Sequence, residues 1–306
     1  MTPARPAPGS LLGIEPLDIK EINHLLDAAY RMQRRRPRPL FKEKRVALLF
    51  YESSTRTRVS FEYAAKILGA TTTLVSATAS SIEKGESLID TGYTLTALGA
   101  QAIIIRHPSS GAPHLLSRYV DVPVINAGDG LHEHPSQALL DAYTILRHKK
   151  TLKGLRVALI GDIFHSRVAR SDVLLFSKAG AHITLCGPEA LVPEVATTLA
   201  PRVSVTRDLK DAIAGADVVI ALRIQKERLA GLQLSLDDYI SRYQLTPERV
   251  RWAKKDAIVM HPGPIIRGLE LTADVADSDR TVIVEQVKNG VAVRMAILAR
   301  ALGVKH

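Results

Sequence analysis

Cysteine is nearly absent from this chain, which has a single thiol, Cys186, in 306 residues. One thiol excludes an internal disulfide, and its place at the end of an apolar run favours a buried structural role. No apolar run approaches the ~20 residues that span a membrane. Residues 1–10 lack the apolar core of a signal peptide and have the composition of a disordered tail. These absences predict a cytoplasmic protein that does not bind membranes.

Aromatic residues make up only 5 % of the chain, whereas 41 Lys and Arg against 31 Asp and Glu give a net charge of +10. A basic excess of this kind raises nucleic acid as a partner. The densest basic run, residues 34–38, has no interleaved aromatic side chains on which bases could stack. We therefore expect no nucleic acid, and interpret the charge as one that attracts a small polyanionic substrate.

Strand-like and helix-like segments alternate along the chain, and the length suits about two domains. Strands are expected at 45–50, 72–75, 102–106, 122–125, 156–160, 182–186, 203–205, 217–222 and 257–260, with helices between them. This alternation is typical of parallel α/β sheets flanked by helices. A polar stretch, 148–154, indicates a domain boundary. A helix is also expected near 189–199, and the last helix, 285–302, carries an apolar stripe.

One segment, 50–61, places hydroxyl and guanidinium groups where a buried strand ends and a helix begins. A helix N-terminus has unpaired backbone N–H groups and a dipole that favours an anion. Two arginines in a first turn oppose that dipole unless an anion is bound there. We therefore predict a phosphate site rather than an ordinary capped helix. Its donors are Ser54, Thr55, Arg56 and Thr57.

Further polar groups follow the other expected strands, at the edge where open α/β sheets bind ligands. Each could by itself be a surface or capping residue. Together, guanidinium groups at the same edge of two sheets predict a cleft between the domains for a ligand with a phosphate and at least one carboxylate. These residues are Arg106, His134 and Gln137 in the first half, and Arg167, Arg223, Gln225, Gly263 and Pro264 in the second.

Neither a metal site nor a dinucleotide site is indicated by spacing. His132, Glu133 and His134 gather titratable groups, but histidines two residues apart do not share a helix face, and the HExxH spacing is missing. Gly161 and Asp162 follow a strand without the GxGxxG pattern. We therefore expect no metal and no cofactor.

In combination, these residues resemble the carbamoyltransferases. Ser-Thr-Arg-Thr-Arg at 54–58 is similar to the carbamoyl phosphate motif of that family, and His-Pro-Ser-Gln-Ala-Leu-Leu-Asp at 134–141 to a second general motif. The segments 223–228 and 261–264 resemble those of the aspartate carbamoyltransferases rather than the His-Cys-Leu-Pro of ornithine enzymes. Gly263 stands where some members carry leucine. The resemblance covers nearly the whole chain after its first ten residues.

The resemblance implies a two-domain fold with its active site in the cleft. Residues 1–146 would bind carbamoyl phosphate, 147–284 would bind aspartate, and a last helix, 285–306, would pack back on the first domain. The implied reaction carbamoylates the amine of L-aspartate, the second step of de novo pyrimidine biosynthesis. A homotrimer with shared sites is also implied, in which Ser81 and Lys84 reach into the neighbouring site. Association with regulatory chains or with a dihydroorotase stays open.

The resemblance assigns roles residue by residue. The catalytic residues would be Arg56, Arg106, His134 and Lys84. The carbamoyl phosphate ligands would be Ser54, Thr55, Arg56, Thr57, Arg106, His134, Gln137, Gly263, Pro264, Ser81 and Lys84. The aspartate ligands would be Lys84, Arg167, Arg223 and Gln225. From the residues themselves, no side chain is a convincing general base, since Glu52 and Glu86 are expected to pair with nearby arginines. The departing phosphate could take the proton itself, and the identity of the base stays open.

Three other interpretations remain open from the sequence. The acceptor could be ornithine or another amine, although two arginines at the acceptor site favour a dicarboxylate. The chain could instead be a non-catalytic module that binds phosphorylated ligands or nucleic acid through its positive surface. A nicotinamide dehydrogenase is a third interpretation, which the missing GxGxxG pattern weakens.

Overall fold

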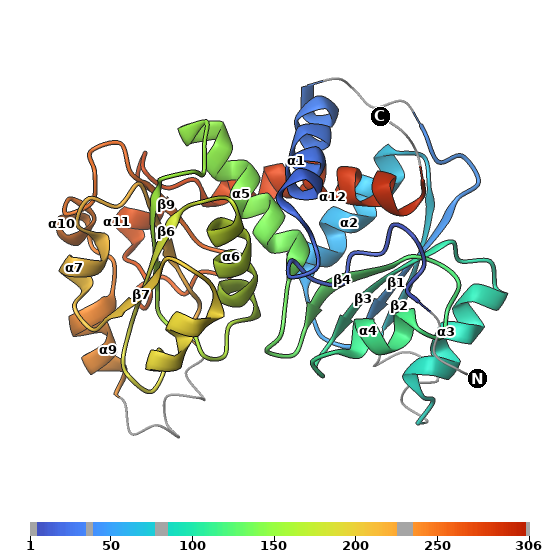
Figure 1. Ribbon diagram of the computed structural model, residues 1–306, viewed down its shortest axis with the longest axis horizontal. Coiled ribbons are helices and arrows are strands. Elements are labelled where there is room, and N and C mark those ends of the chain that lie inside the picture. Colours follow the sequence, from blue (N-terminus) through green and yellow to red (C-terminus); the bar gives the residue numbers. More distant parts are fainter. Residues whose placement is uncertain (1–4, 35–38, 77–84, 225–234, 304–306) are drawn as a thin grey trace. The chain divides into compact units, whose positions relative to one another are not determined.

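The chain folds as two units, each built on its own parallel sheet (Figure 1). The computed structural model describes residues 5–34, 39–76, 85–224 and 235–303. The first unit comprises residues 1–143 and 287–306, and the second comprises 144–286. The sequence predicted these divisions at 146/147 and 284/285.

Four parallel strands form the described sheet of the first unit, in the order β2-β1-β3-β4. The strands are β1 (Arg45–Phe50), β2 (Thr71–Ser76), β3 (Ala102–His107) and β4 (Val124–Asp129). Its helices include α1 (Ile19–Arg34), α2 (Thr55–Ile67), α3 (Leu88–Ala97) and α4 (Ala112–Ser117), while α5 (Pro135–Lys149) and α12 (Ile283–Ala301) each run from one unit into the other. Figure 1 shows α3 and α4 on one face of the sheet and α1, α2 and α12 on the other.

The core of the first unit follows from the strand pattern, because alternate residues point to opposite faces. Ala47, Leu49, Ile103 and Ile105 pack on one face in a single buried cluster with side chains of α3 and α4. A strand that is buried on both faces has a continuous apolar sequence. These strands could therefore be predicted although their residues do not alternate between apolar and polar.

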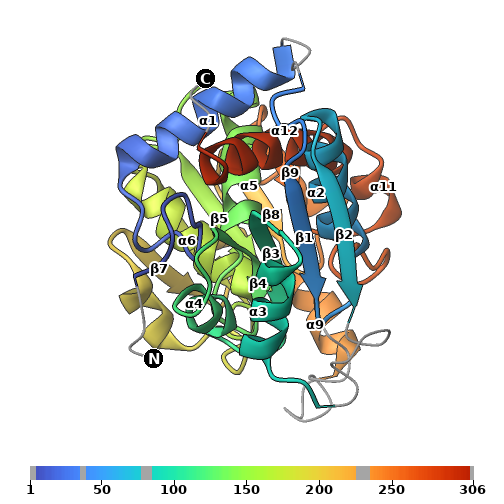
Figure 2. The same ribbon diagram turned by 90° about the vertical axis from the view of Figure 1, so that its right-hand side faces the viewer.

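Helix α12 lies beside α1, although 248 residues separate their nearest ends in the chain, between Arg34 and Ile283 (Figures 1 and 2). Gln33 Nε2 donates to Asn289 Oδ1 at 2.8 Å, and Arg300 donates to Glu21 at 3.3 Å. Helix α1 begins with a capping box, in which Asp18 N donates to Glu21 Oε2 and Glu21 N donates to Asp18 Oδ1.

The second unit has a described sheet of five parallel strands in the order β7-β6-β5-β8-β9. The strands are β5 (Arg156–Ile160), β6 (His182–Cys186), β7 (Val203–Thr206), β8 (Val218–Ala221) and β9 (Ile258–Met260). The helices are α6 (Arg167–Lys178), η3 (Glu194–Leu199), α7 (Leu209–Ile213), α9 (Leu236–Tyr243), α10 (Pro247–Val250) and α11 (Ala273–Ala276). Figure 1 shows α6 on one face and α7 with α9 on the other. Together with the first unit, this confirms the predicted α/β class.

Two local predictions need correction. The helix expected near 189–199 is a short 3-10 helix, η3, that begins only after Pro193. Proline lacks an amide hydrogen and its ring clashes with the preceding turn, so a helix cannot continue through it. Strand β4 extends as far as Asp129, and it therefore includes polar residues that the sequence placed after the strand.

Within the described residues, no helix combines the length and apolar character needed to cross a membrane.

Candidate active site

Each sheet reverses its strand order at one point, and several of the predicted ligand groups lie at the carboxyl ends of the strands on either side of it. In the first unit the reversal lies between β1 and β3. The 51–57 segment follows β1 directly, and Arg106 and His107 are the last two residues of β3. In the second unit it lies between β5 and β8, which precede Arg167 and Arg223. Open α/β sheets bind ligands at such reversals, beyond the carboxyl ends of the strands.

The N-terminus of α2 differs from those of the described helices that begin with a capping Ser, Thr or Asp. Its N-cap residue, Ser54, makes no side-chain capping hydrogen bond. By contrast, six helices of the described chain begin with a Ser, Thr or Asp whose side chain accepts a backbone N–H: α3, α6, α7, α9, α10 and α11. The Ser54 side chain thus does not occupy the backbone donors at the start of α2, as an anion site there requires.

Arg106 is fixed beside this helix start by the sheet itself. It pairs in register with Phe50, the last residue of β1, and its carbonyl accepts from Tyr51 N at 2.9 Å. Its Nε lies 3.3 Å from Glu52 Oε2. The sequence prediction that Glu52 pairs with an arginine is confirmed. For Glu86 the described partner is instead the Thr91 hydroxyl, at 3.0 Å.

His134 stands just before α5 and reaches the first turn of α2. Its Nε2 lies 3.5 Å from Thr57 Oγ1, and its Nδ1 lies 3.4 Å from Ser136 Oγ. Only 5 % of Thr57 and 4 % of His134 is exposed. Two of the predicted phosphate ligands, 77 residues apart in sequence, are therefore brought together in a nearly dry environment.

Gln137 has its amide orientation set by Asp141, one turn further along α5. The amide nitrogen donates to both carboxylate oxygens at 3.1 Å. A carboxylate can only accept, so the amide oxygen of Gln137 has to face away from Asp141. Arg294 of α12 lies near Asp141 and stacks over Phe61, with its guanidinium carbon 5.0 Å from the ring centroid. Burial lowers the pKa of Arg294 to about 10, against the opposing effect of the Asp141 charge.

In the second unit, Arg167 is the first residue of α6. The N-cap of this helix is Ser166, whose hydroxyl accepts from Ala169 N at 3.1 Å. The segment between β5 and α6 is held by Asp162, which accepts from both the backbone and the ring of His165 at 3.0 Å. The backbone at Arg167 is therefore held by hydrogen bonds on both sides, by Asp162 before it and by the Ser166 cap at the helix start.

Arg223 is exposed, and the residue after it is tied to a buried carboxylate. Glu270 Oε1 accepts from Ile224 N, and Glu270 Oε2 accepts from Ile266 N, both at 3.0 Å. One side chain thus joins the Arg223 segment to the segment that contains Gly263 and Pro264. Burial raises the pKa of Glu270, whereas the two backbone N–H bonds oppose that rise. The Gly263 N–H also donates to His261 Nδ1 at 2.8 Å.

Three predicted site residues, Ser81, Lys84 and Gln225, lie outside the described residues. Sequence reasoning gave no role to Asp141, Glu270 or Arg294. Asp141 could have been found, because it lies four residues after Gln137 and so on the same helix face. Glu270 and Arg294 gave no such signal, since Glu270 meets Ile224 across 46 residues and Arg294 meets Phe61 from a helix far away in the chain.

Two family models match almost the whole chain. The carbamoyl-P binding domain of aspartate/ornithine carbamoyltransferases matches residues 10–147, and the Asp/Orn binding domain of the same enzymes matches residues 153–301. The chain therefore belongs to the aspartate/ornithine carbamoyltransferase family.

Within this family, two curated relatives that match the chain are aspartate carbamoyltransferase catalytic subunits. The chain is 62 % identical to the aspartate carbamoyltransferase catalytic subunit of Koribacter versatilis over 295 residues, which is 96 % of this chain and 97 % of the relative. It is 52 % identical to the subunit of the same name from Solibacter usitatus over 301 residues, 97 % of this chain and the full relative.

Solved structures agree on the fold but not on the acceptor. Ornithine carbamoyltransferase from Pyrococcus furiosus superposes with a TM-score of 0.88 at 30 % identity, covering 98 % of this chain and 99 % of that one. Aspartate transcarbamoylase from Trypanosoma cruzi, in complex with carbamoyl aspartate and phosphate, gives 0.87 at 32 % identity, covering 97 % and 96 %. Backbone similarity therefore does not distinguish the two acceptors, whereas sequence identity to the curated relatives does.

Proposed function

We propose that this chain transfers the carbamoyl group of carbamoyl phosphate to the amine of L-aspartate, giving N-carbamoyl-L-aspartate and phosphate. It is a transferase of the aspartate carbamoyltransferase class. The observation that supports this best is the placement of arginines and hydroxyls at the strand-order reversal of both sheets. Phosphate and carboxylate are the anions that guanidinium groups bind through paired hydrogen bonds.

The carbamoyl phosphate ligands proposed from the first unit gather around the start of α2. Its backbone N–H groups, with Ser54, Thr55, Arg56 and Thr57, would hold the phosphate. Arg106 and His134 would polarise the carbonyl oxygen, where negative charge develops. The Gln137 oxygen, turned away from Asp141, would accept from the carbamoyl NH2, with help from the carbonyls of the 262–264 segment.

In the proposed reaction the aspartate amine attacks the carbonyl carbon and forms a C–N bond. The carbonyl electron pair moves onto oxygen, giving a tetrahedral intermediate. This intermediate collapses with cleavage of the C–O bond to phosphate, and the departing phosphate takes the amine proton. Catalysis then rests on preorganised charge and on holding the substrates in attack geometry, which accounts for the absence of an obvious protein base in the sequence.

The second unit would supply the acceptor site. Arg167 and Arg223, assisted by Gln225, suit the two carboxylates of aspartate, whereas the cationic side chain of ornithine would be repelled by them. By joining the segments after Arg223 and around Gly263, Glu270 would keep the acceptor ligands in register with the carbamoyl ligands.

The assembly and location are part of the same proposal. Ser81 and Lys84 of a neighbouring chain would complete each site in a homotrimer, and Lys84 would contact both substrates. The enzyme would work in the cytoplasm, with a reaction that uses no metal or cofactor, alone or joined to regulatory chains or a dihydroorotase. Light scattering of the purified chain tests the trimer: a trimeric mass supports it, and an active monomer contradicts it.

A carbamoyl-transfer assay tests the function itself. The purified chain is given carbamoyl phosphate with either L-aspartate or L-ornithine, and the carbamoylated product is measured. We expect product with aspartate alone. Product with ornithine alone would keep the phosphate site and contradict the acceptor site. No product with either acceptor would contradict the proposed activity of the isolated chain.

A further inference from the structure

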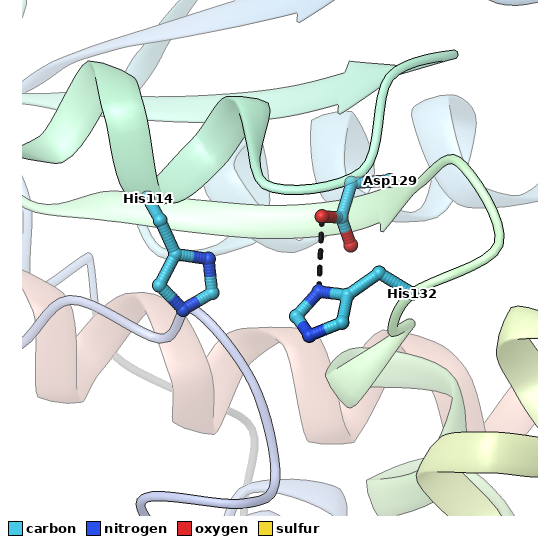
Figure 3. Close-up of side chains that lie close together, drawn as sticks. All are labelled: His114, Asp129 and His132. Carbon is cyan, nitrogen blue, oxygen red and sulfur yellow. Dashed lines mark hydrogen bonds and ion pairs between the residues drawn. The ribbon is translucent and has the colours of Figure 1, made fainter.

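Two histidines and an aspartate from three separate segments of the first unit converge outside the proposed phosphate site. They are His114 of α4, Asp129 at the end of β4 and His132 in the turn before α5. One possible ligand atom from each residue lies within 4.8 Å of the other two. Figure 3 shows the imidazoles of His114 and His132 on the same side of the Asp129 carboxylate. Imidazole and carboxylate are ligands that transition metals prefer.

The carboxylate of this cluster is rigidly placed by backbone and amide donors. Asp129 Oδ1 accepts from Asn126 Nδ2 at 2.8 Å and from Glu133 N at 3.1 Å, and Oδ2 accepts from Gly111 N at 2.7 Å. Asp129 is fully buried. Among the residues that the structure describes, no lysine or arginine forms an ion pair with it. A buried carboxylate held by neutral donors attracts a cation, because burial without a counter-charge is costly.

The first of the two histidines already stands at a distance typical of metal ligands. His132 Nδ1 lies 3.1 Å from Asp129 Oδ2. Two ligands on a tetrahedral zinc, with bonds of ~2.0–2.1 Å, are separated by about 3.3 Å. A cation could therefore replace the hydrogen between these two atoms with little movement of either side chain.

The second histidine, His114, has a ring nitrogen that makes no hydrogen bond within the described chain. This nitrogen, Nδ1, is buried. Figure 3 shows one ring nitrogen of His114 turned toward Asp129 and His132. The two imidazoles meet edge to face, with centroids 5.6 Å apart. The Nδ1 atom of His114 can therefore face a bound cation without breaking any hydrogen bond among the described residues.

We propose that His114, Asp129 and His132 form a binding site for a divalent transition-metal cation, with zinc as the best fit. Two nitrogens and one oxygen leave a fourth tetrahedral position for water. The hard, oxygen-preferring cations Mg²⁺ and Ca²⁺ are disfavoured by the imidazoles. The site would link α4, the end of β4 and the turn that leads to His134, so the metal would fix the approach to α5.

Sequence reasoning weighed a metal on different residues. It considered His132 with Glu133 and His134, which share a short run. In the structure Glu133 accepts from Ile14 N at 2.7 Å, and His134 faces Thr57. Only His132 belongs to the cluster, and its partners lie 3 and 18 residues away.

Metal titration of the full, untagged chain tests the site after treatment with a chelator. Zinc binding is measured by calorimetry, and cobalt is used as a coloured probe, because tetrahedral cobalt absorbs visible light strongly. We expect one zinc per chain and a tetrahedral cobalt spectrum without a thiolate charge-transfer band, which excludes Cys186 as a ligand. Either the absence of zinc binding or an octahedral cobalt spectrum would overturn the proposal.

Substitutions locate the metal, with a matched control in the second unit. His114→Asn and His132→Gln should each weaken zinc binding by at least ~10–100-fold. This is the loss usually seen when a residue that only hydrogen-bonds to a metal ligand is removed. His165→Asn is the control, because His165 contacts Asp162 in the same way but belongs to no three-residue cluster among the described residues. Unchanged affinity in His114→Asn, or a loss in His165→Asn that equals the others, would contradict the assignment. The cobalt spectrum of the unmodified chain decides the matter if a variant does not fold.

Discussion

The predicted ligand groups of the first unit gather around one helix start, with Thr57, His134 and Gln137 buried, whereas those of the second unit are spread over separate segments. In the first unit, Thr57 and His134 lie within 3.5 Å of each other, and α2 lacks a side-chain cap. In the second unit, α6 is capped by its own Ser166, Arg223 is exposed, and one buried carboxylate ties the segments together.

The difference matches what each proposed substrate demands. A phosphate is compact, and a single helix start can surround it with donors. Aspartate carries two carboxylates at opposite ends, so its ligands have to come from separate segments held in register. We therefore expect damage to the first unit to lower turnover, and damage to the second to weaken binding of the acceptor.

The largest effect is expected from removal of the guanidinium at the start of α2. Arg56→Ala should lower kcat by about 10²–10³, the usual loss when one preorganised charge donor is removed. Arg223→Ala should instead raise KM for aspartate more than it lowers kcat. Steady-state kinetics with each substrate varied in turn separate the two cases.

Arg58→Ala is the matched control for this prediction. Arg58 stands in the same first turn, but its guanidinium lies 3.6 Å from the Glu62 carboxylate, one turn further along the helix. A partly exposed ion pair of this kind contributes about 0–1 kcal/mol, so kinetics should hardly change. If Arg56→Ala keeps near-normal turnover, or if Arg58→Ala is equally damaging, the phosphate site is misassigned.

The next effect tests the link within the second unit. Glu270→Gln leaves one amide oxygen, so it can accept only one of the two backbone N–H groups and turns an NH2 toward the other. Losing one such bond to a charged acceptor, about 1.5–3 kcal/mol, should raise KM for aspartate at least tenfold. KM for carbamoyl phosphate should change less.

The pKa of Glu270 adds a test by pH. Because burial raises that pKa, the carboxylate becomes protonated at a higher pH than an exposed glutamate as the solution is acidified. KM for aspartate should therefore rise as the pH falls toward this pKa, and this rise should vanish in Glu270→Gln. Glu248→Gln, at an exposed position of α10, is the control. A profile that is identical in all three chains would contradict the role of Glu270.

A smaller loss of activity is expected when Asp141 no longer fixes which way the Gln137 amide faces. Asp141→Asn keeps the shape but allows the facing amides to bond in either orientation, so the Gln137 oxygen no longer has to face outward. We expect a loss in kcat/KM for carbamoyl phosphate of about tenfold, equivalent to ~1.4 kcal/mol. Asp27→Asn, exposed on α1, should leave this ratio unchanged. An unaltered ratio in Asp141→Asn would show that Asp141 does not position the amide.

The smallest effect concerns Cys186, whose modification should report on the second unit alone. Burial raises the pKa of this thiol to about 12, so at pH 8 only about one molecule in 10⁴ carries the reactive thiolate. Ellman's reagent should therefore react very slowly with the folded chain and rapidly after denaturation. Rapid reaction of the folded enzyme would mean that the second sheet opens readily, which would remove the contrast between the units.

The positions of strands and helices were largely predictable from the sequence because buried parallel strands are continuous apolar runs and caps are local. The Asp18–Glu21 box and the segment 54–57 could therefore be found by inspection. The helix expected near 189–199 was wrong because Pro193 was given too little weight.

The contacts that orient the site could not be predicted in the same way. Glu270 meets Ile224 across 46 residues, and Arg294 meets Phe61 between two helices far apart in the chain. Such contacts depend on packing and burial, which leave no periodic signal in one sequence. The grouping of His114 with His132 has the same origin.

Helix α12 belongs mostly to the first unit, although almost all of the second unit precedes it in the chain. During synthesis, residues 144–286 are therefore complete while the first unit still lacks its last helix. The apolar side chains that α12 buries, among them Val293 and Leu298, are then missing from its core. The half of the enzyme that is made first is thus the half that finishes folding last, and a chain cut short before residue 287 would lose the phosphate-binding unit rather than the acceptor unit.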